Sequence, residues 1–338
     1  MKKVMLSNKA KNVLNDSARI AAVDTGFARL TAVFDRAVKC RPFYLSGHVA
    51  NASDGLQYTD PEQWVADNLE ALADMVSQAE PNSADLTSWC VECPFYGVHF
   101  IDKIFGAEVF FYNDGWHNRH LQQEVGTLAM PNLETNETWT LAKRAALAFV
   151  AHDVKLPLFG TPTLSSALNI GVNLYGQELL FAMLANPDAA HRDLRVINDV
   201  IAAFHRWYVA NVPERLLQPV ISWNRTQPPG YGQLCGCTTQ LISGAHYAEF
   251  VAALDNEILG LHPRGGMMHL CGKSSQHIPA LRAMPNLRAI QVNDDAAHDL
   301  QKYHSGLRDD QIIYLNPCEG MTTQHALSIT GGDRLVVA

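Results

Sequence analysis

The sequence lacks the features that mark exported, membrane-spanning, nucleic-acid-binding and nucleotide-binding proteins. Its N-terminal apolar run, Val4–Leu6, is too short for the core of a signal peptide, and no apolar stretch approaches the length of a membrane span. The net charge is −8 and no dense Lys/Arg run occurs, which argues against a nucleic-acid partner. The chain has no Walker-type phosphate loop, no GxGxxG motif between a strand and a helix, and no GxSxG elbow. We therefore expect a cytoplasmic protein without membrane or nucleic-acid partners, and the missing motifs favour metal chemistry.

Cysteine is present but does not suggest a disulfide framework. The chain has seven cysteines, an odd number in 338 residues without an export signal. This usage indicates reduced thiols. Metal binding, catalysis and plain burial therefore compete as roles for each thiol.

The pattern of apolar residues favours one α/β barrel. The composition, 47% hydrophobic and 18% charged, is ordinary for a globular protein. In the C-terminal third, predicted helices alternate with predicted strands at 266–271, 287–292, 311–315 and 334–337. Such alternation implies a parallel sheet with helices outside it. We expect a (β/α)8 TIM-type barrel at residues 41–338, an N-terminal helical extension at residues 1–40, and functional residues at the carboxyl ends of strands.

Earlier elements are predicted from local signals. Asp60 and Pro61 are typical of a helix start, and this helix should run to about Gln78. Apolar residues recur every three or four positions from His191 to Val209, which predicts an amphipathic helix. Further strands are predicted at 43–48, 88–93, 107–112, 156–160 and 219–223.

The stretch Met267–Gly272 carries the strongest chemical signal. The apolar run is too short for a helix and therefore predicts a buried strand. Because residues two apart on a strand face the same side, His269 and Cys271 can point into one site. A thiolate beside an imidazole at a strand end suits zinc. The same pattern also fits a core strand with one hydrogen-bonded histidine and one inert thiol.

Other strand ends supply further candidates. Asp294 follows the predicted strand 287–292, and Cys318 and Glu319 follow the strand 311–315. Cys318 comes after the second strand beyond His269, so we expect it to reach the His269–Cys271 pair across the barrel mouth. Three protein ligands and an open fourth position are typical of catalytic zinc. His48 is a candidate because it ends a predicted strand.

Two cysteine pairs are rivals for metal binding. Cys90 and Cys93 have the spacing of a metal knuckle or a redox motif, and Cys235 and Cys237 lie in a Gly-rich segment. The pairs could form a four-cysteine structural site or could simply be buried. Cys235, Cys237 and Glu319 also remain alternatives to Cys318 as third ligand.

Several segments carry a resemblance to a known family. The segment His269–Leu281 followed by Ala289–Asp294, and Cys237–Ser243 leading into Tyr247–Phe250, resemble the uroporphyrinogen decarboxylase superfamily, particularly its cobalamin-linked methyltransferase branch. The similarity extends over roughly residues 25–338 and is specific from about residue 235 onward.

The resemblance implies a (β/α)8 barrel in which a His-x-Cys pair and a later cysteine bind zinc. Zinc in that branch activates a thiol to accept a methyl group from a corrinoid protein. The resemblance implies that His269 and Cys271 are zinc ligands. It implies Cys318 less directly, because the family's third cysteine lies nearer the final strand. Asp294 and Glu319 are candidates, by position, to orient His269 or to accept a proton. The chain has no DxHxxG-type corrinoid-binding segment, so a methylcorrinoid would be carried by a partner protein.

Two other functions stay open. One is a metal-free decarboxylase or lyase of the same superfamily, acting on a small acid, with His48, His269 and Asp294 as acid-base groups. A tetrapyrrole substrate is disfavoured because the family's arginine-rich N-terminal motif is missing and Ser46–Ala50 stands in its place. The other is a barrel that binds a small molecule or a corrinoid partner without catalysis. The sequence does not identify the methyl donor, the acceptor thiol or the direction of reaction. It also leaves open whether the chain forms an oligomer.

Overall fold

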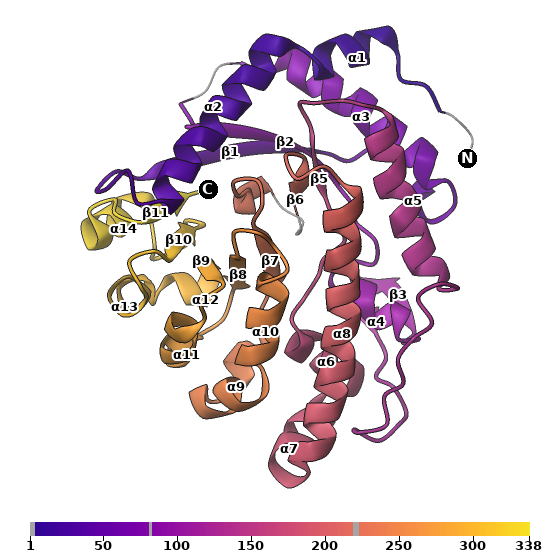
Figure 1. Ribbon diagram of the computed structural model, residues 1–338, viewed down its shortest axis with the longest axis vertical. Coiled ribbons are helices and arrows are strands. Elements are labelled where there is room, and N and C mark those ends of the chain that lie inside the picture. The colour runs from indigo at the N-terminus through magenta and orange to yellow at the C-terminus, as the bar shows by residue number, and fades with distance from the viewer. Residues whose placement is uncertain (1–3, 81–82, 219–222) are drawn as a thin grey trace.

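The computed structural model describes residues 4–80, 83–218 and 223–338. Within these ranges, nine parallel strands form one sheet in the order β6-β5-β2-β1-β11-β10-β9-β8-β7. The sheet curves around an interior and helices surround it (Figure 1). The strands are β1 (Phe43–Ala50), β2 (Leu86–Glu92), β5 (Leu158–Gly160), β6 (Leu217–Gln218), β7 (Gly232–Cys235), β8 (Gly266–Leu270), β9 (Leu287–Val292), β10 (Ile312–Leu315) and β11 (Leu335–Val337). The expected α/β barrel is confirmed, nearly closed, with β6 and β7 at the two ends of the sheet.

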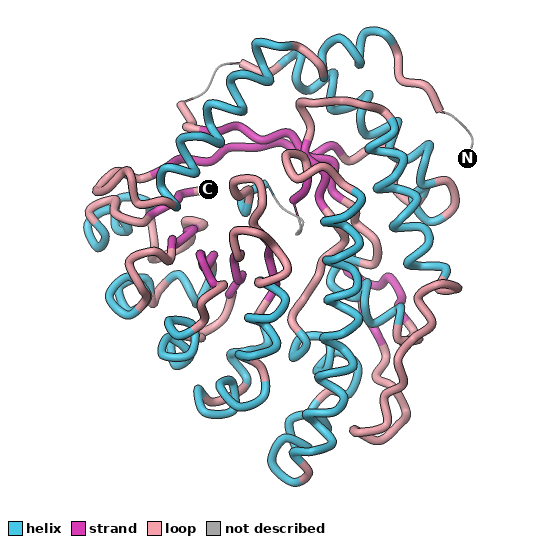
Figure 2. The backbone as a smooth tube through the Cα atoms, viewed as in Figure 1, coloured by secondary structure: helices cyan, strands magenta, loops and turns pink. Residues whose placement is uncertain are grey.

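The helices follow the strands along the chain and cover the outside of the sheet (Figure 2). They are α1 (Asn8–Leu14), α2 (Ser17–Phe34), α3 (Pro61–Gln78), α4 (Phe100–Ile104), α5 (Glu137–Ala151), α6 (Ala167–Tyr175), α7 (Gln177–Ala185), α8 (Pro187–Asn211), α9 (Gly244–Phe250), α10 (Ala252–Leu259), α11 (Ile278–Ala283), α12 (Asp294–Ala297), α13 (Leu300–Gly306) and α14 (Thr323–Thr330). Short 3-10 helices are η1 (Leu56–Tyr58), η2 (Gly97–His99), η3 (Trp223–Arg225), η4 (Cys237–Leu241) and η5 (Ser275–His277). Among the described helices, none is both long and apolar enough to cross a bilayer.

Local signals explain where the long helices begin. The Asp60 side chain accepts a hydrogen bond from Gln63 N and Pro61 occupies the first turn of α3, as predicted. α8 contains the predicted helix 191–209 and buries a stripe that includes Leu194, Ile201 and Tyr208. Because this stripe recurs at helical spacing, α8 can lie along the barrel with its polar face outward.

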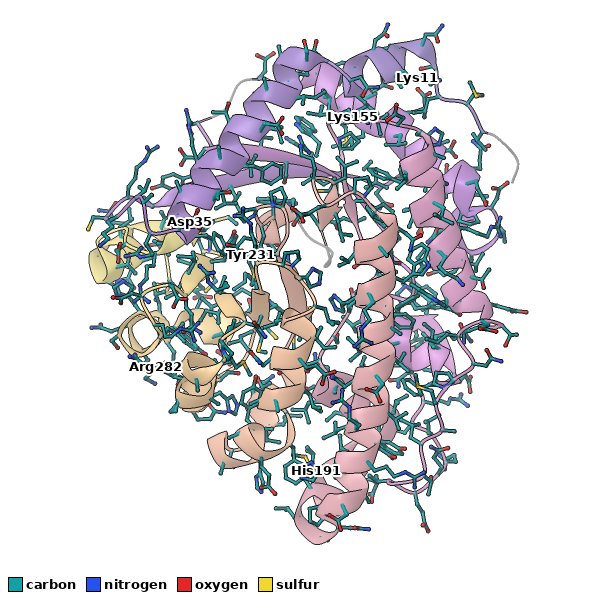
Figure 3. All side chains as sticks on the ribbon, viewed as in Figure 1. Lys11, Asp35, Lys155, His191, Tyr231 and Arg282 are labelled. Carbon is teal, nitrogen blue, oxygen red and sulfur yellow. The ribbon has the colours of Figure 1, made fainter. Side chains whose placement is uncertain are left out.

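The N-terminal helices pack on the barrel. α1 contacts α3 and α2 contacts β2. Phe34, the last residue of α2, packs on Tyr231 just before β7, with ring centroids 4.6 Å apart (Figure 3 labels Tyr231). The Phe34 ring also lies 6.2 Å from that of Tyr314 on β10, so the C-terminal end of α2 packs on aromatic rings of the barrel. The division of the chain into an N-terminal helical extension at residues 1–40 and a barrel domain at residues 41–338 stays a prediction.

Two predicted strands differ from the structure. The run 107–112 does not join the barrel: β3 (Val109–Tyr112) pairs antiparallel with β4 (Gly115–Asn118) in a separate hairpin. Asn113 and Asp114 both have positive φ, the conformation that a tight two-residue hairpin turn requires. The predicted strand 219–223 falls largely on residues 219–222, which lie outside the described residues.

Candidate metal centre

A row of interior side chains crosses four neighbouring strands near their carboxyl ends. In the register of the sheet, Cys235 on β7 is opposite His269 on β8, and His269 is opposite Gln291 on β9. Gln291 is in turn opposite Tyr314 on β10. Residues paired in register share a face of the sheet, so these four side chains point the same way.

The chain adds two thiols just beyond this row. Cys237 opens η4, two residues after Cys235, and Cys271 follows β8 two residues after His269. The ligand atoms of Cys237, His269 and Cys271 all lie within 4.8 Å of one another. His269 is 5% exposed, whereas both cysteines are half-buried. The three residues form a group that could hold a metal ion.

Gln291 sets the tautomer of His269. His269 Nδ1–H donates to Gln291 Oε1. This hydrogen bond leaves the lone pair on His269 Nε2 for a ligand. Burial lowers the pKa of His269, so the imidazole is neutral near neutral pH and able to coordinate.

The two thiols share one proton. A hydrogen bond from Cys237, and then the neighbouring His269, lowers the pKa of Cys271. The same Cys237–Cys271 hydrogen bond, together with burial, raises the pKa of Cys237. These shifts favour the thiolate form at Cys271 and the thiol form at Cys237.

Hydrogen bonds hold the segment that carries Cys237. Thr238 N donates to Asn169 Oδ1 on α6 at 3.0 Å, and the Thr238 hydroxyl donates to the same oxygen. Thr239 Oγ1 donates to Gly236 O at 2.7 Å, and His277 Nε2 donates to Thr239 O at 2.8 Å. Anchors from α6 and from η5 therefore keep Cys237 next to β8.

Cys235 lies under the group and contacts Arg225. Arg225 Nη1 donates to Cys235 Sγ at 3.6 Å. Burial raises the pKa of the Cys235 thiol, and the positive charge of Arg225 opposes that effect. Cys235 is therefore a buried, protonated thiol next to the three-residue group and not a member of it.

Cys318, the expected third ligand, lies outside this three-residue group, and its role as a ligand stays a prediction. Cys318 is not in the group that the described residues form; its Sγ lies 3.8 Å from Asp294 O. Backbone hydrogen bonds between Cys318 and Met321, 3.1 and 3.0 Å long, hold this turn after β10. β10 is separated from β8 by β9, whereas β7 is adjacent to β8, so Cys237 lies nearer to His269 in the sheet order than Cys318 does.

The other predicted site residues are not members of the three-residue group, although the negative charge of Asp294 acts on Cys271. Asp294 is exposed at the start of α12 and accepts from Asn293 Nδ2 at 2.9 Å. Glu319 is exposed, and its backbone carbonyl accepts from His298 Nε2 at 2.9 Å. Roles for Asp294 and Glu319 stay predictions.

His48 does not end its strand, because β1 continues to Ala50. Its ring stacks on Trp89, with centroids 4.4 Å apart and planes 16° from parallel. The pair lines a surface cavity with Arg19 and Arg29 of α2. His48 therefore faces α2 on the outside of the sheet.

Cys90 and Cys93 are also outside the group found among the described residues. Both are fully buried, and burial raises the pKa of each thiol well above its usual value. Buried thiols of this kind are inert packing residues.

Sequence analysis missed two residues of the site. Gln291 gave only a weak signal, as a polar residue within the predicted strand 287–292; its complete burial and its contact with His269 come from the structure. Arg225 gave no local signal, since it lies in an irregular segment whose position depends on the whole barrel.

Comparisons with solved structures give a likeness in fold. No family model matches the chain, and no curated protein matches its sequence. Among solved structures, a methyltransferase from Methanosarcina mazei is similar, with a TM-score of 0.63 at 11% sequence identity. The match covers 93% of this chain and 92% of that chain. The likeness therefore extends over nearly the whole of both chains and concerns the fold.

Proposed function

We propose that this chain is a zinc-dependent methyltransferase that moves a methyl group between a corrinoid, or another methyl donor, and a metal-activated thiol. The observation that carries the proposal is the Cys237–His269–Cys271 group at the carboxyl ends of β7 and β8. Functional residues of α/β barrels lie at this end. The likeness in fold to a methyltransferase supports the same conclusion.

The donor set fits zinc. Two cysteine sulfurs and one imidazole nitrogen are ligands that zinc prefers. With zinc–sulfur bonds of about 2.3 Å and tetrahedral angles, the two sulfurs would lie about 3.8 Å apart. The donor atoms of this group are within 4.8 Å of one another, so small side-chain rotations suffice. Three protein ligands leave the fourth position for an incoming thiol.

The residues also balance charge. Two thiolates, Cys237 and Cys271, and a neutral His269 would compensate the two positive charges of zinc. The bound ion would keep an incoming thiol deprotonated near neutral pH while leaving it nucleophilic. In the transfer, a bond forms between the acceptor sulfur and the methyl carbon. The bond from that carbon to the donor breaks with its electron pair going to the donor, and the thiol proton passes to solvent.

The superfamily and the methyl donor belong to the same proposal. The segments 237–243 and 269–294 resemble the cobalamin-linked branch of the uroporphyrinogen decarboxylase superfamily. A methylcorrinoid on a partner protein is the donor that this resemblance implies. The metal-free decarboxylase is not favoured by the geometry, because one of its acid-base groups, His48, faces α2 outside the sheet.

Metal analysis of untagged, anaerobically prepared protein tests the proposal. We expect one zinc per chain and methyl transfer from methylcobalamin to a small thiol, followed by the cobalamin spectrum. Cys271→Ala should lose both, while Cys93→Ala, a buried cysteine outside the group, should keep its zinc. Wild-type protein without stoichiometric metal would refute the zinc assignment.

A further inference from the structure

A cavity of about 430 Å³ lies at the amino-terminal ends of β8 and β9. It is lined by residues 260–265, which precede β8, and by Pro285, Asn286 and Arg288, where β9 begins. The metal group follows the carboxyl ends of β7 and β8, so this cavity is at the opposite end of the barrel. Its volume is in the range of sites for small molecules.

Backbone contacts fix the two walls of the cavity. Gly265 has a φ of +76°, and a Cβ at this position would lie 2.3 Å from Asn286 O, so the close approach requires glycine. Gly266 N donates to Asn286 O at 2.9 Å, and Asn286 Nδ2 donates to Asn256 O at 3.0 Å. The loops before β8 and β9 are therefore held against each other.

The charged side chains that line the cavity are positive. Arg264 and Arg288 are lining residues, and within the described ranges no Asp or Glu is among them. Arg264 is exposed, and no carboxylate of the described residues is within 4.0 Å of its guanidinium, although Glu214 is near its stem. Arg288 pairs with Asp310 at 3.5 Å, but Asp310 also pairs with Arg308 at 2.8 Å. One carboxylate thus serves two guanidinium groups, and Arg264 adds a positive charge without an ion pair.

The two lining arginines meet at the phenol of Tyr231. Arg264 donates a hydrogen bond to Tyr231 Oη. Burial raises the pKa of Tyr231, the positive charges of Arg288 and Arg264 oppose this effect, and the negative charge of Asp35 adds to it. Nη1 of Arg288 makes no hydrogen bond within the described ranges and is not among the fully buried atoms. Both guanidinium groups therefore have donors available at one side of the cavity.

A buried histidine supplies a further donor. His262 lines the cavity, is 6% exposed, and places Nε2 2.9 Å from His205 Nδ1. Burial lowers the pKa of both histidines, so both rings are neutral near neutral pH and share one N–H between them. His205 Nε2 is buried without a partner among the described residues, which disfavours the tautomer that would place an N–H there.

This choice of tautomer directs an N–H into the cavity. His205 Nδ1–H donates to His262 Nε2, and His262 keeps its own N–H at Nδ1. In the part of the chain that the structure describes, His262 Nδ1 has no partner and is not among the fully buried atoms. It is therefore accessible from the cavity that His262 lines.

We propose that this cavity binds a phosphate group, carried by a small molecule, through Arg264, Arg288 and His262. Guanidinium groups match phosphate oxygens in geometry, and a tetrahedral phosphate accepts from donors that approach from different directions. The cavity is larger than a phosphate ion, which leaves room for the organic part of a small phosphomonoester. The inference does not depend on the proposed methyl transfer, since the metal group is at the other end of the barrel.

Three probes test the assignment by calorimetric titration. Inorganic phosphate and glycerol 3-phosphate should each saturate one site per chain, whereas glycerol should not bind. Tighter binding of glycerol 3-phosphate would identify a phosphomonoester as the ligand, and tighter binding of inorganic phosphate would identify the free ion. Absence of saturable binding of both phosphates to the wild-type protein would overturn the proposal.

Variants locate the binding at this cavity. Arg264→Gln should raise the dissociation constant for inorganic phosphate roughly tenfold to hundredfold, the loss expected for a charge-assisted hydrogen bond. Arg264→Lys should keep part of the affinity. Arg19→Gln makes the same change of charge in the separate cavity that His48 lines, and should keep all of it. Arg264 and Arg19 are both exposed, and circular dichroism confirms the fold of each variant. Equal affinities in the wild-type protein and Arg264→Gln would contradict the assignment.

NMR of protein with ring-15N-labelled histidine tests the third donor. Addition of inorganic phosphate should shift the Nδ1 signal of His262, assigned through the coupling across its hydrogen bond to His205, and leave the signals of His48 in place. A His262 signal that does not move at saturation would rule out this donor.

The zinc-free variant Cys271→Ala separates this site from the metal group. Unchanged affinity for inorganic phosphate in Cys271→Ala would support the cavity whether or not the chain transfers a methyl group. Loss of phosphate binding together with zinc would place the anion at the metal group, and the proposal would be wrong.

Discussion

The buried carboxyl group of Asp255 should make folding stability depend on pH. Asp255 on α10 is fully buried, and Tyr247 Oη donates to its Oδ2 at 2.9 Å. Its other oxygen has no hydrogen-bond partner among the described residues. Burial raises the pKa of Asp255 to about 7. The folded protein therefore holds this carboxyl group protonated over much of the acidic range.

The size and sign of the effect follow from linkage. In the unfolded chain, an aspartate has a pKa of about 3.9. Below pH ~4 both states are protonated, and Asp255 leaves the free energy of unfolding unchanged. Between pH ~4 and ~7 only the unfolded state ionises, so stability falls by about 1.36 kcal/mol per pH unit. The full loss is about 4 kcal/mol, and about 3 kcal/mol of it falls between pH 5 and 8.

Asp255→Asn removes the titrating group and retains an acceptor for Tyr247. Urea unfolding followed by tryptophan fluorescence should show that the wild-type protein loses about 3 kcal/mol more than the variant between pH 5 and 8. Asp114→Asn, at an exposed hairpin turn, should behave as the wild-type protein does. The reasoning is refuted if the wild-type protein and Asp255→Asn show the same dependence on pH.

Three further predictions concern the metal group. Cys237→Ala should lose zinc whereas Cys318→Ala retains it, as measured by elemental analysis; the reverse result would restore Cys318 as the third ligand. Gln291→Leu should weaken zinc binding roughly tenfold to hundredfold, because His269 loses the acceptor that sets its tautomer; competition with a chromogenic chelator measures this. Removal of zinc with a chelator should lower the melting temperature of the wild-type protein and leave that of Cys271→Ala unchanged, since that variant has no zinc to lose.

The accuracy of the predicted elements depended on the strength of their local signals. β9 was predicted with its observed bounds, because the apolar residues Leu287, Ala289, Ile290 and Val292 lie between two asparagines that bound the run. α3 begins where Asp60 and Pro61 indicate and ends at the predicted Gln78. The run 107–112 has the same β-rich character, but its hairpin pairing depends on Asn113 and Asp114, which were not recognised as a turn.

The site required tertiary information that these signals do not contain. His269 and Cys271 could be grouped from their spacing alone, since residues two apart on a strand share a face. Gln291 could not, because its role depends on the register between β8 and β9. The position of Arg225 depends on contacts that are further apart in the sequence, because hydrogen bonds to strands β2, β7 and β10 hold its segment.

Cys237 could not be preferred to Cys318 from the sequence because β7 was not predicted. β7 has only four residues, Gly232–Cys235, and two of them, glycine and glutamine, carry little β-propensity. Without β7, Cys235 and Cys237 fell in a loop of unknown position, and Cys318 remained the thiol with a predicted strand before it. Once β7 is placed beside β8, with Cys235 opposite His269, the residues two positions beyond each of them must also be neighbours. This register brings Cys237 close to Cys271, independently of the conformation of the turn after β10 that carries Cys318. The pairing of β7 with β8 therefore explains which residues form the group.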